Sequence, residues 1–419
     1  MSQELIEKAN ILLQQNNFPE AGKIFRQLWE EDNNAYCASR YLHCLRKAGY
    51  TSHGLSQGKK ASSQFPNNIY IQRELVWIYY DIIKTSTQEN NLQDALNNFE
   101  QMLTLNPDSL PLELAIFLII DLAQEKNQWQ IIMDICSQVN PSQISNESKI
   151  INGNKVKSKR ERYYFKYIKS LIELNHWNQV KNIAYNAISN FPKEINFKRW
   201  YALALSNNGD IEQGISELEK IILNDRQEWY LFQDISELYW QKNQEETALR
   251  YACKACLATK EHNLKVTLYQ NIAKMCLEVN RLELAVKHIQ LSKLVRQQEG
   301  WKIKPELEKL ENEIKQKCQE NNIELTEYSF DELAKNCLQI WRKESYRGLE
   351  RHQGIIESIP PDKSFGWIRA YNGDRIFFMQ KQLPPFLRKE NLKVSFILED
   401  SWDHKKNQLS SKAVDIRKE

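Results

Sequence analysis

The sequence has no long apolar stretch and no segment typical of a secretion signal. Its longest apolar run, Ala115 to Ile120, is bounded by Glu113 and Asp121, whereas a membrane-spanning helix needs about 20 apolar residues. The first ten residues carry Glu4 and Glu7 and no apolar core of signal-peptide length. We therefore expect a cytoplasmic protein without a membrane-spanning segment.

No motif in the sequence carries a nucleophile, a metal cluster or a nucleotide cradle. Gly54 to Lys60 is one residue short of a phosphate-binding loop, lacks its Ser or Thr, and belongs to a helical pattern with no preceding strand. Cys253 and Cys256 have metal-like spacing, but no second Cys or His pair follows at zinc spacing, so core thiols are favoured. The eight cysteines lie inside helical patterns, which suits reduced thiols better than a disulfide framework. We therefore expect no enzyme, no metal and no cofactor.

The net charge of +3 is small, but it is unevenly distributed. Residues 351–419 hold 13 Lys and Arg against 9 Asp and Glu, which leaves 44 against 45 in the rest of the chain. Phosphate binding needs a local cationic surface, so this excess directs attention to the C-terminal part. A second basic run is more typical of a solvated loop, although it could also contact phosphate. That run comprises Lys155, Lys157, Lys159, Arg160 and Arg162.

One spacing recurs along the first 300 residues: a large apolar residue, a small residue three positions on, and an apolar residue four further on. The copies are Phe18-Ala21-Phe25, Leu92-Ala95-Phe99, Trp177-Val180-Ala184, Ile211-Gly214-Leu218 and Leu282-Ala285-Ile289. Trp177 and Ile211 are 34 residues apart, and a further 34 residues reach Glu245. Pro107 and Pro192 fall where the second helix of a pair should stop. A fixed period of this length indicates a repeat architecture.

These features resemble tetratricopeptide repeats. The resemblance implies a mostly α fold, an α-solenoid of about eight helix pairs from Ser2 to about Arg296, with a groove that binds a protein or peptide. The residues from Asn140 to Arg160 interrupt the repeats with Pro, Ser, Asn and Gly, and we expect a mobile surface loop there.

The repeat pattern ends near Trp301, and a helical linker over residues 301–350 is predicted. Its last helix has a capping-box arrangement of Ser329 and Glu332. The apolar stripe of this helix must pack against either the last repeat or the domain that follows. That stripe comprises Leu333, Cys337, Ile340 and Trp341.

From Gly354 the apolar period changes to two, which indicates strands. We predict five short strands, the size of a small OB-type β-barrel, and divide the chain into residues 1–300, 301–350 and 351–419. Asn372-Gly373 is a strong signal for a tight hairpin. The first predicted strand begins with Ile355, Ile356 and Ile359. The other four are Phe365 to Arg369, Arg375 to Met379, Lys393 to Leu398 and Ser410 to Ile416.

Alternation along the second and third strands separates two faces. An apolar inner face of Ile368, Ile376 and Phe378 suits a barrel core, which leaves three aromatic side chains on the outer face. Exposed neighbouring aromatics normally mark a binding site, and single-stranded nucleic acid needs flat rings for its bases and cations for its backbone. The outer aromatics are Phe365, Trp367 and Phe377, with Lys363, Arg369 and Arg375 around them.

The same strands resemble the cold-shock family. Residues 363–368, Lys-Ser-Phe-Gly-Trp-Ile, are similar to its first RNA-binding motif, Lys-Gly-Phe-Gly-Phe-Ile, and residues 376–379, Ile-Phe-Phe-Met, to its second, Val-Phe-Val-His. The resemblance covers about 65 of 419 residues and implies single-stranded RNA or DNA binding, with Met379 as a further contact. Three departures weaken the stacking platform: Ser358 in place of an exposed Trp, Met379 in place of His, and Ser364 in place of Gly. Phe386 and Trp402, expected on loops, are candidate replacements.

Two functions therefore remain open. In the first, the barrel binds single-stranded nucleic acid while the superhelix recruits a protein partner. In the second, the chain is a protein-interaction scaffold whose barrel has lost its ligand, or whose outer aromatics are buried by the preceding helix. Such an organisation fits bacterial RNA regulation or a multi-protein defence assembly. The residues indicate neither the partner nor the oligomeric state.

Overall fold

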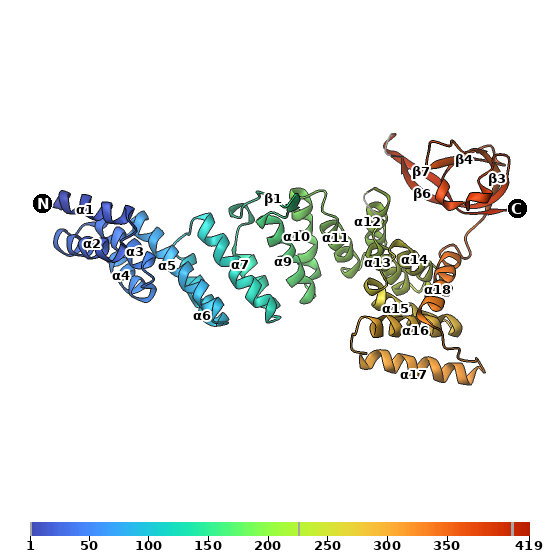
Figure 1. The fold of residues 1–419 in the computed structure, drawn as a ribbon, viewed down its shortest axis with the longest axis horizontal. Helices are drawn as coiled ribbons and strands as arrows, with labels where there is room; N and C mark the ends of the chain where they lie inside the picture. The colour runs from blue at the N-terminus through green and yellow to red at the C-terminus, as the bar shows by residue number, and fades with distance from the viewer. Residues whose placement is uncertain (1, 225–226, 404–405) are drawn as a thin grey trace. The chain divides into compact units, whose positions relative to one another are not determined.

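The computed structural model describes residues 2–224, 227–403 and 406–419, and Figure 1 shows the order of their elements. The chain divides into two compact units, Met1–Phe191 and Pro192–Glu419. The first unit is helical apart from one small hairpin, and the second unit joins further helices to a β-barrel.

The first unit is a series of antiparallel helix pairs in which consecutive helices pack together. The helices are α1 (Ser2–Gln14), α2 (Phe18–Asp32), α3 (Ala35–Lys47), α4 (Thr51–Gln64), α5 (Ile69–Gln88), α6 (Leu92–Leu103), α7 (Ser109–Glu125), α8 (Trp129–Gln138), α9 (Lys159–Glu173) and α10 (Trp177–Asn190). Ala21, Ala95 and Val180, the middle residues of three copies of the predicted spacing, are fully buried. The repeat spacing therefore identified real packing positions.

The predicted mobile loop between residues 140 and 160 is wrong in part, because the segment contains regular structure. A short 3-10 turn (Pro141–Gln143) is followed by β1 (Lys149–Ile151) and β2 (Asn154–Val156), which pair antiparallel through the turn at Asn152 and Gly153. Both turn residues have positive φ, the conformation that a tight hairpin requires. Two of the loop-forming residues, Asn152 and Gly153, lie in the turn, but the strands on either side of it were missed.

The second unit begins with three more helix pairs and adds two single helices. The pairs are α11 (Ile195–Asn207) with α12 (Ile211–Asn224), α13 (Trp229–Gln241) with α14 (Glu245–Ala258), and α15 (Val266–Glu278) with α16 (Leu282–Gln298). The single helices are α17 (Pro305–Glu320) and α18 (Phe330–Glu344). With the five pairs of the first unit, the described residues contain the eight pairs that the sequence predicted.

Asparagine ends many of these helices. Asn16, Asn90, Asn175, Asn243 and Asn280 all have φ between 56° and 61°, the left-handed conformation that stops a helix. Asparagine adopts this conformation more readily than most residues because its short amide can hydrogen-bond locally. Pro107 and Pro192 lie just beyond the ends of α6 and α10, as predicted.

Helix α18 is not a free linker, because it packs against α14 and α16. Leu333, Cys337 and Trp341 are buried in the same apolar core as α15 and α16, and Ile340 is half-buried. The structure therefore selects the last repeat as the surface that covers the stripe. Ser329 is the N-cap of α18 but makes no side-chain capping bond, so the predicted capping box is not formed.

Five strands follow α18 and close into a barrel in the order β3-β4-β5-β7-β6. The strands are β3 (His352–Ser358), β4 (Phe365–Ala370), β5 (Arg375–Met379), β6 (Lys393–Asp403) and β7 (Gln408–Lys418), with two 3-10 turns at Gln380–Gln382 and Pro385–Leu387. All pairs are antiparallel except β5 with β7. Ile359 lies outside β3, and β6 and β7 are longer than predicted.

The barrel core contains the predicted inner face. Ile368 and Phe378 are fully buried, and half-buried Ile376 packs against the same cluster. Gly366 lies among them because a Cβ there would meet the Phe378 ring at 2.6 Å and the Ser358 carbonyl at 2.8 Å. Glycine at position 366 is therefore required by packing, whatever the barrel binds.

Within the described ranges, no helix combines the length and apolarity needed to cross a membrane. All eight cysteines are unpaired and buried. Burial raises the pKa of the Cys253 and Cys256 thiols, which suits the core role expected for this pair. The division into residues 1–300, 301–350 and 351–419 remains a prediction.

Candidate functional site

The outer face of the barrel carries a cluster of three aromatic rings. Phe365, Trp367 and Phe377 are each half-buried, and their ring centroids lie 5.5 to 6.2 Å apart. Trp367 is the register partner of Phe377 across β4 and β5, and Phe365 is the partner of Met379. Paired residues of neighbouring strands lie on the same face, so these four predicted residues form one surface.

Both predicted arginines are paired with one carboxylate, which the sequence did not indicate. Glu357 of β3 accepts from the Arg369 guanidinium and, at 2.5 Å, from Arg375 Nε. These bonds lower the pKa of Glu357, so it is ionised at neutral pH. The Arg375 guanidinium also lies 4.5 Å from the centre of the Trp367 ring. Both arginines are thus held beside the aromatic cluster, but their charge is partly neutralised.

The remaining predicted contacts are dispersed. Lys363 is exposed on the approach to β4, with Nζ 3.5 Å from its neighbour Asp362. Phe386 is 73% exposed on the turn after β5, so it is available as a stacking residue. Trp402 was expected on a loop, but it lies within β6, where it is the register partner of Leu409. Of these two, only Phe386 therefore lies between strands as predicted, within the 3-10 turn Pro385–Leu387.

Helix α18 is fixed to the repeats through Trp341. The Trp341 ring stacks on Tyr269 with centroids 5.6 Å apart and planes within 8° of parallel. Its Nε1–H donates to His288 Nε2 at 2.9 Å, and His288 Nδ1–H donates to the Leu284 carbonyl at 2.7 Å. The apolar stripe of α18 therefore packs in the helical core and does not cover the aromatic face of the barrel.

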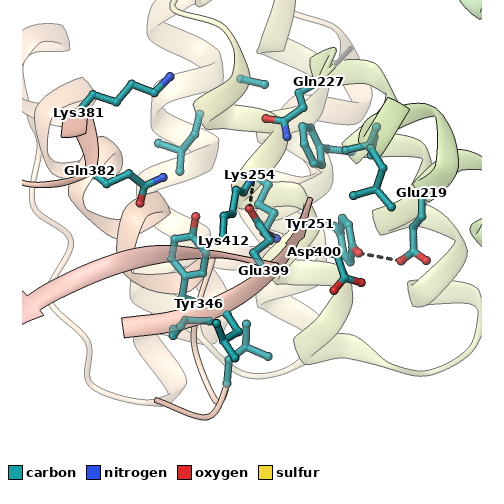
Figure 2. A pocket seen from close by; sticks show the side chains of 18 residues that line it. Glu219, Gln227, Tyr251, Lys254, Tyr346, Lys381, Gln382, Glu399, Asp400 and Lys412 are labelled. Atoms are coloured by element: carbon teal, nitrogen blue, oxygen red, sulfur yellow. Dashed lines mark hydrogen bonds and ion pairs between the residues drawn. The ribbon is translucent and has the colours of Figure 1, made fainter. Parts of the chain in front are cut away.

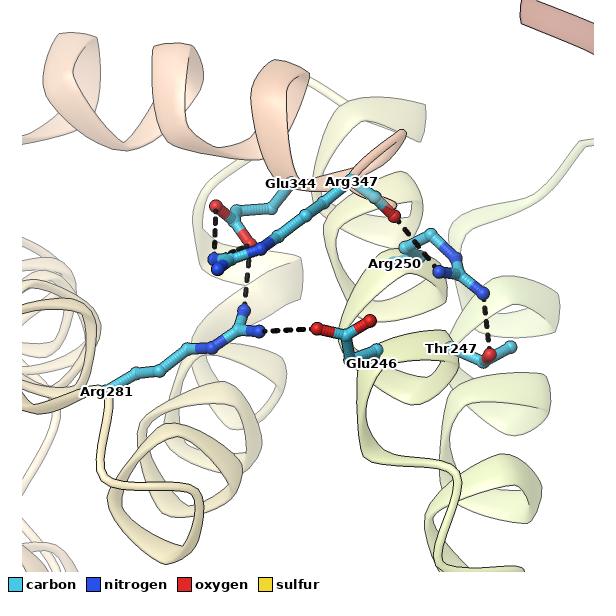
Figure 3. Close-up of polar contacts among 6 residues, drawn as sticks. All are labelled: Glu246, Thr247, Arg250, Arg281, Glu344 and Arg347. Carbon is cyan, nitrogen blue, oxygen red and sulfur yellow. Dashed lines mark hydrogen bonds and ion pairs between the residues drawn. The ribbon is translucent and has the colours of Figure 1, made fainter. Parts of the chain in front are cut away.

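Charged residues fix the end of α18, where the chain turns toward the barrel (Figure 3). The nearly buried carboxylate of Glu344 accepts from Arg281 at 2.9 Å and from Arg347 at 3.3 Å. Arg281 reaches Glu246 as well, and Arg250 donates to the Arg347 carbonyl at 3.0 Å. These contacts join the end of α18 and the residues after it to α14 and to the start of α16.

The barrel meets the helices at a cleft of about 580 Å³, shown in Figure 2. Glu399 of β6 pairs with Lys254 of α14 at 2.5 Å and with Lys412 of β7 at 3.1 Å. Lys254 Nζ also lies 5.4 Å from the Tyr251 ring centre and 5.6 Å from that of Tyr346. Sequence reasoning missed this site because its residues, from Glu219 to Lys412, lie up to 193 positions apart and belong to no motif.

The basic run near residue 160 is engaged within the first unit. Lys159 pairs with the buried Glu113 carboxylate, and Arg160 donates to the carbonyls of Ile144 and Ser142. Arg162 lies 3.7 Å from Asp121. These cations hold the insertion against α7, so the run is used in part for structure.

Comparisons with known families cover only part of the chain. A family model described as a domain of unknown function (DUF7017) matches residues 197–334, about a third of the chain, from α11 to the start of α18. No curated protein matches the sequence significantly.

Solved structures similar to this chain include several tetratricopeptide-repeat proteins. One from Parabacteroides merdae is 15% identical, with a TM-score of 0.28, over 64% of this chain and 96% of that one. YrrB, described as a TPR protein with an unusual peptide-binding site, is 13% identical, with a TM-score of 0.30, over 58% and 96%. The TPR2AB domain of yeast Sti1 in complex with pHSP90 is 13% identical, with a TM-score of 0.26, over 75% and 98%.

Proposed function

We propose that this chain is an interaction scaffold whose helical array binds a protein partner. The observation that carries this proposal is a row of exposed apolar side chains on three neighbouring helices: Tyr36 is 43% exposed, Tyr70 63% and Leu110 55%. Each is the second residue of its helix, α3, α5 or α7, and α5 packs against both of the others. Helix α4 lies between α3 and α5, and α6 lies between α5 and α7. Because consecutive helices run in opposite directions, α3, α5 and α7 begin on the same side of the array. Exposed apolar surface of this kind typically serves protein contacts.

The row can be tested by affinity capture from the native cell, followed by identification of the proteins retained. A Tyr36→Ala/Tyr70→Ala/Leu110→Ala variant should lose a partner that the unaltered protein retains. Tyr50→Ala is the matched control, because Tyr50 is 58% exposed but precedes α4, which begins on the opposite side. Retention of the same partners by the triple variant would contradict the proposal.

A second candidate function is favoured by the aromatic face of the barrel. Phe365, Trp367 and Phe377 offer contiguous rings for stacked bases, and the strand motifs resemble those of cold-shock domains. We propose that this face binds single-stranded RNA or DNA, with Lys363, Arg369, Arg375 and Met379 around it. Binding should be weakly sequence-selective, because stacking accepts any base.

Fluorescence anisotropy of labelled oligonucleotides with the intact protein tests the second function. The Trp367→Ala/Phe377→Ala variant should lose most of the binding, since each stacked base contributes about 1 to 3 kcal/mol. Circular dichroism establishes that the variant is folded. Tyr371→Ala is the control, because Tyr371 is 55% exposed at the tip of the β4–β5 hairpin. Equal binding by the double variant and the control would exclude this face.

A further inference from the structure

The strand register connects the aromatic face to the cleft. Trp367 is the partner of Phe377, Phe377 of Lys412, and Lys412 of Glu399. Residues paired in this way all point outward, and neighbouring strands are about 4.8 Å apart, so the row follows the curved outer wall of the closed barrel for about 14 Å, from β4 through β5 and β7 to β6. Its last member, Glu399, pairs with Lys254 of the helical array. The aromatic cluster and the cleft are therefore joined by a path of outward-facing residues around the barrel wall.

We infer that single-stranded nucleic acid bound on the aromatic face continues into this cleft, so that Lys254 of the helical array belongs to the same binding site. The inference rests on the second proposed function and extends it from the barrel to α14. It makes the array a part of the nucleic-acid site in addition to a surface for a protein.

The cleft offers cations from three separate elements. Lys254 comes from α14, Lys412 from β7, and the exposed Lys381 from the turn after β5 (Figure 2). Tyr251 and Tyr346 also line the cleft, and each ring lies within 6 Å of Lys254 Nζ. Both tyrosines are half-buried, and ammonium groups beside accessible ring surface are the combination that binds the backbone and bases of a single strand.

Glu399 keeps two of these lysines in position. Burial raises its pKa, but Lys254 and Lys412 outweigh burial and lower it, so the carboxylate is ionised. A phosphate in the cleft would replace Glu399 as the partner of one lysine, while the other lysine stays paired with Glu399. Glu219 and Asp400 also line the cleft, and Glu219 accepts from the Tyr251 hydroxyl at 2.8 Å. The nucleic acid must therefore pass beside Lys254, Lys381 and Lys412 and away from Glu219 and Asp400, because carboxylates repel phosphate.

Oligonucleotide length separates the two parts of the site. A labelled U4 can cover the aromatic face alone, whereas a labelled U12 is long enough to reach the cleft. In Lys254→Ala/Lys381→Ala protein, U12 affinity should fall about tenfold, and its slope of log affinity against log salt should lessen by about 1.4, two phosphate contacts' worth. U4 affinity should not change.

Two further variants make the result specific. Lys254→Arg/Lys381→Arg keeps both charges and should keep U12 binding. Lys302→Ala/Lys309→Ala removes two exposed lysines at and before α17 and should also leave it unchanged. Equal U12 affinity in the alanine variant and the unaltered protein, or an equal loss for U4 and U12, would overturn the extension into the cleft while leaving the aromatic face intact. Binding of neither oligonucleotide by the unaltered protein would overturn the nucleic-acid function itself, and this inference with it.

Discussion

At the residue scale, the charge state of the aromatic face depends on Glu357. It holds Arg369 and Arg375 together, and Arg375 in turn covers the Trp367 ring. A phosphate must therefore compete with a carboxylate for both guanidinium groups. This competition, together with the missing aromatic at Ser358, explains why affinity at this face should be moderate.

Glu357→Gln should raise the affinity for single-stranded oligonucleotides. Loss of the carboxylate frees two cations for phosphate, so binding should strengthen several-fold and its salt dependence should steepen. Anisotropy titrations at two salt concentrations measure both effects. Asp374→Asn is the control, because it removes the same charge from the nearby hairpin, where Asp374 accepts from Asn372. An equal gain in the two variants would show that only net charge matters.

His288 makes the docking of α18 sensitive to acid. Burial lowers the pKa of His288 from 6.5 to about 4, although the hydrogen bond to the Leu284 carbonyl opposes this shift. The neutral ring accepts from Trp341. The unfolded chain takes up a proton as pH falls below about 6.5, whereas the folded chain resists until about pH 4. The stability that neutral His288 contributes is thus fully present above pH 6.5 and is lost progressively as the pH falls to about 4.

Urea unfolding at pH 7 and pH 5 tests this linkage. The unaltered protein should lose on the order of 2 kcal/mol more stability than His288→Gln, whose amide can still accept from Trp341. The comparison must be with this variant, because burial also lowers the pKa of His262, which lies beside the same Trp341 ring. The same loss in both proteins would assign the acid sensitivity to other groups.

At the scale of elements, close approach of α12 to α11 depends on one glycine. A Cβ on Gly214 would lie 1.8 Å from Ser206 Oγ and 2.8 Å from the Ala202 carbonyl. The backbone carbonyl cannot move aside without separating the helices. Gly214 was one of the small residues of the repeat spacing, and the structure gives the reason for it.

Gly214→Ala should therefore destabilise the second unit by about 1 to 3 kcal/mol, although alanine favours helix. Thermal or urea unfolding followed by circular dichroism measures the change. Ser216→Ala, at an exposed position of the same helix, should be neutral or slightly stabilising. A Gly214→Ala protein as stable as the control would show that the helices can separate without cost.

At the scale of the whole molecule, the two compact units should respond separately to local damage. In arrays of helix pairs each pair contacts mainly its neighbours, so destabilisation spreads a short distance. Phe25→Ala, which removes a fully buried ring in the first unit, should cost about 3 to 5 kcal/mol there. Hydrogen exchange should quicken in α1 to α4 and remain unchanged in α13 to α18. Faster exchange throughout the chain would contradict independent units.

The sequence by itself determined the elements whose signals are local. Period-two alternation placed Phe365, Trp367 and Phe377 on one face and Ile368 and Phe378 on the other, because side chains of a strand alternate by geometry alone. The repeat spacing likewise located helix pairs, since small residues must lie where helices touch. Strand ends were less accurate: β6 continues to Asp403 because it pairs with β7 far beyond the predicted Leu398.

Only the tertiary structure decided which charges meet. Glu357 lies 12 residues from Arg369, and Lys254 lies 145 residues from Glu399, so no local pattern links either pair. The covering of the α18 stripe by the repeats, with Trp341 on Tyr269, was equally open, because an amphipathic helix shows that it must be covered but not by what. Periodicity depends on neighbours along the chain, whereas ion pairs and docking depend on how distant elements pack.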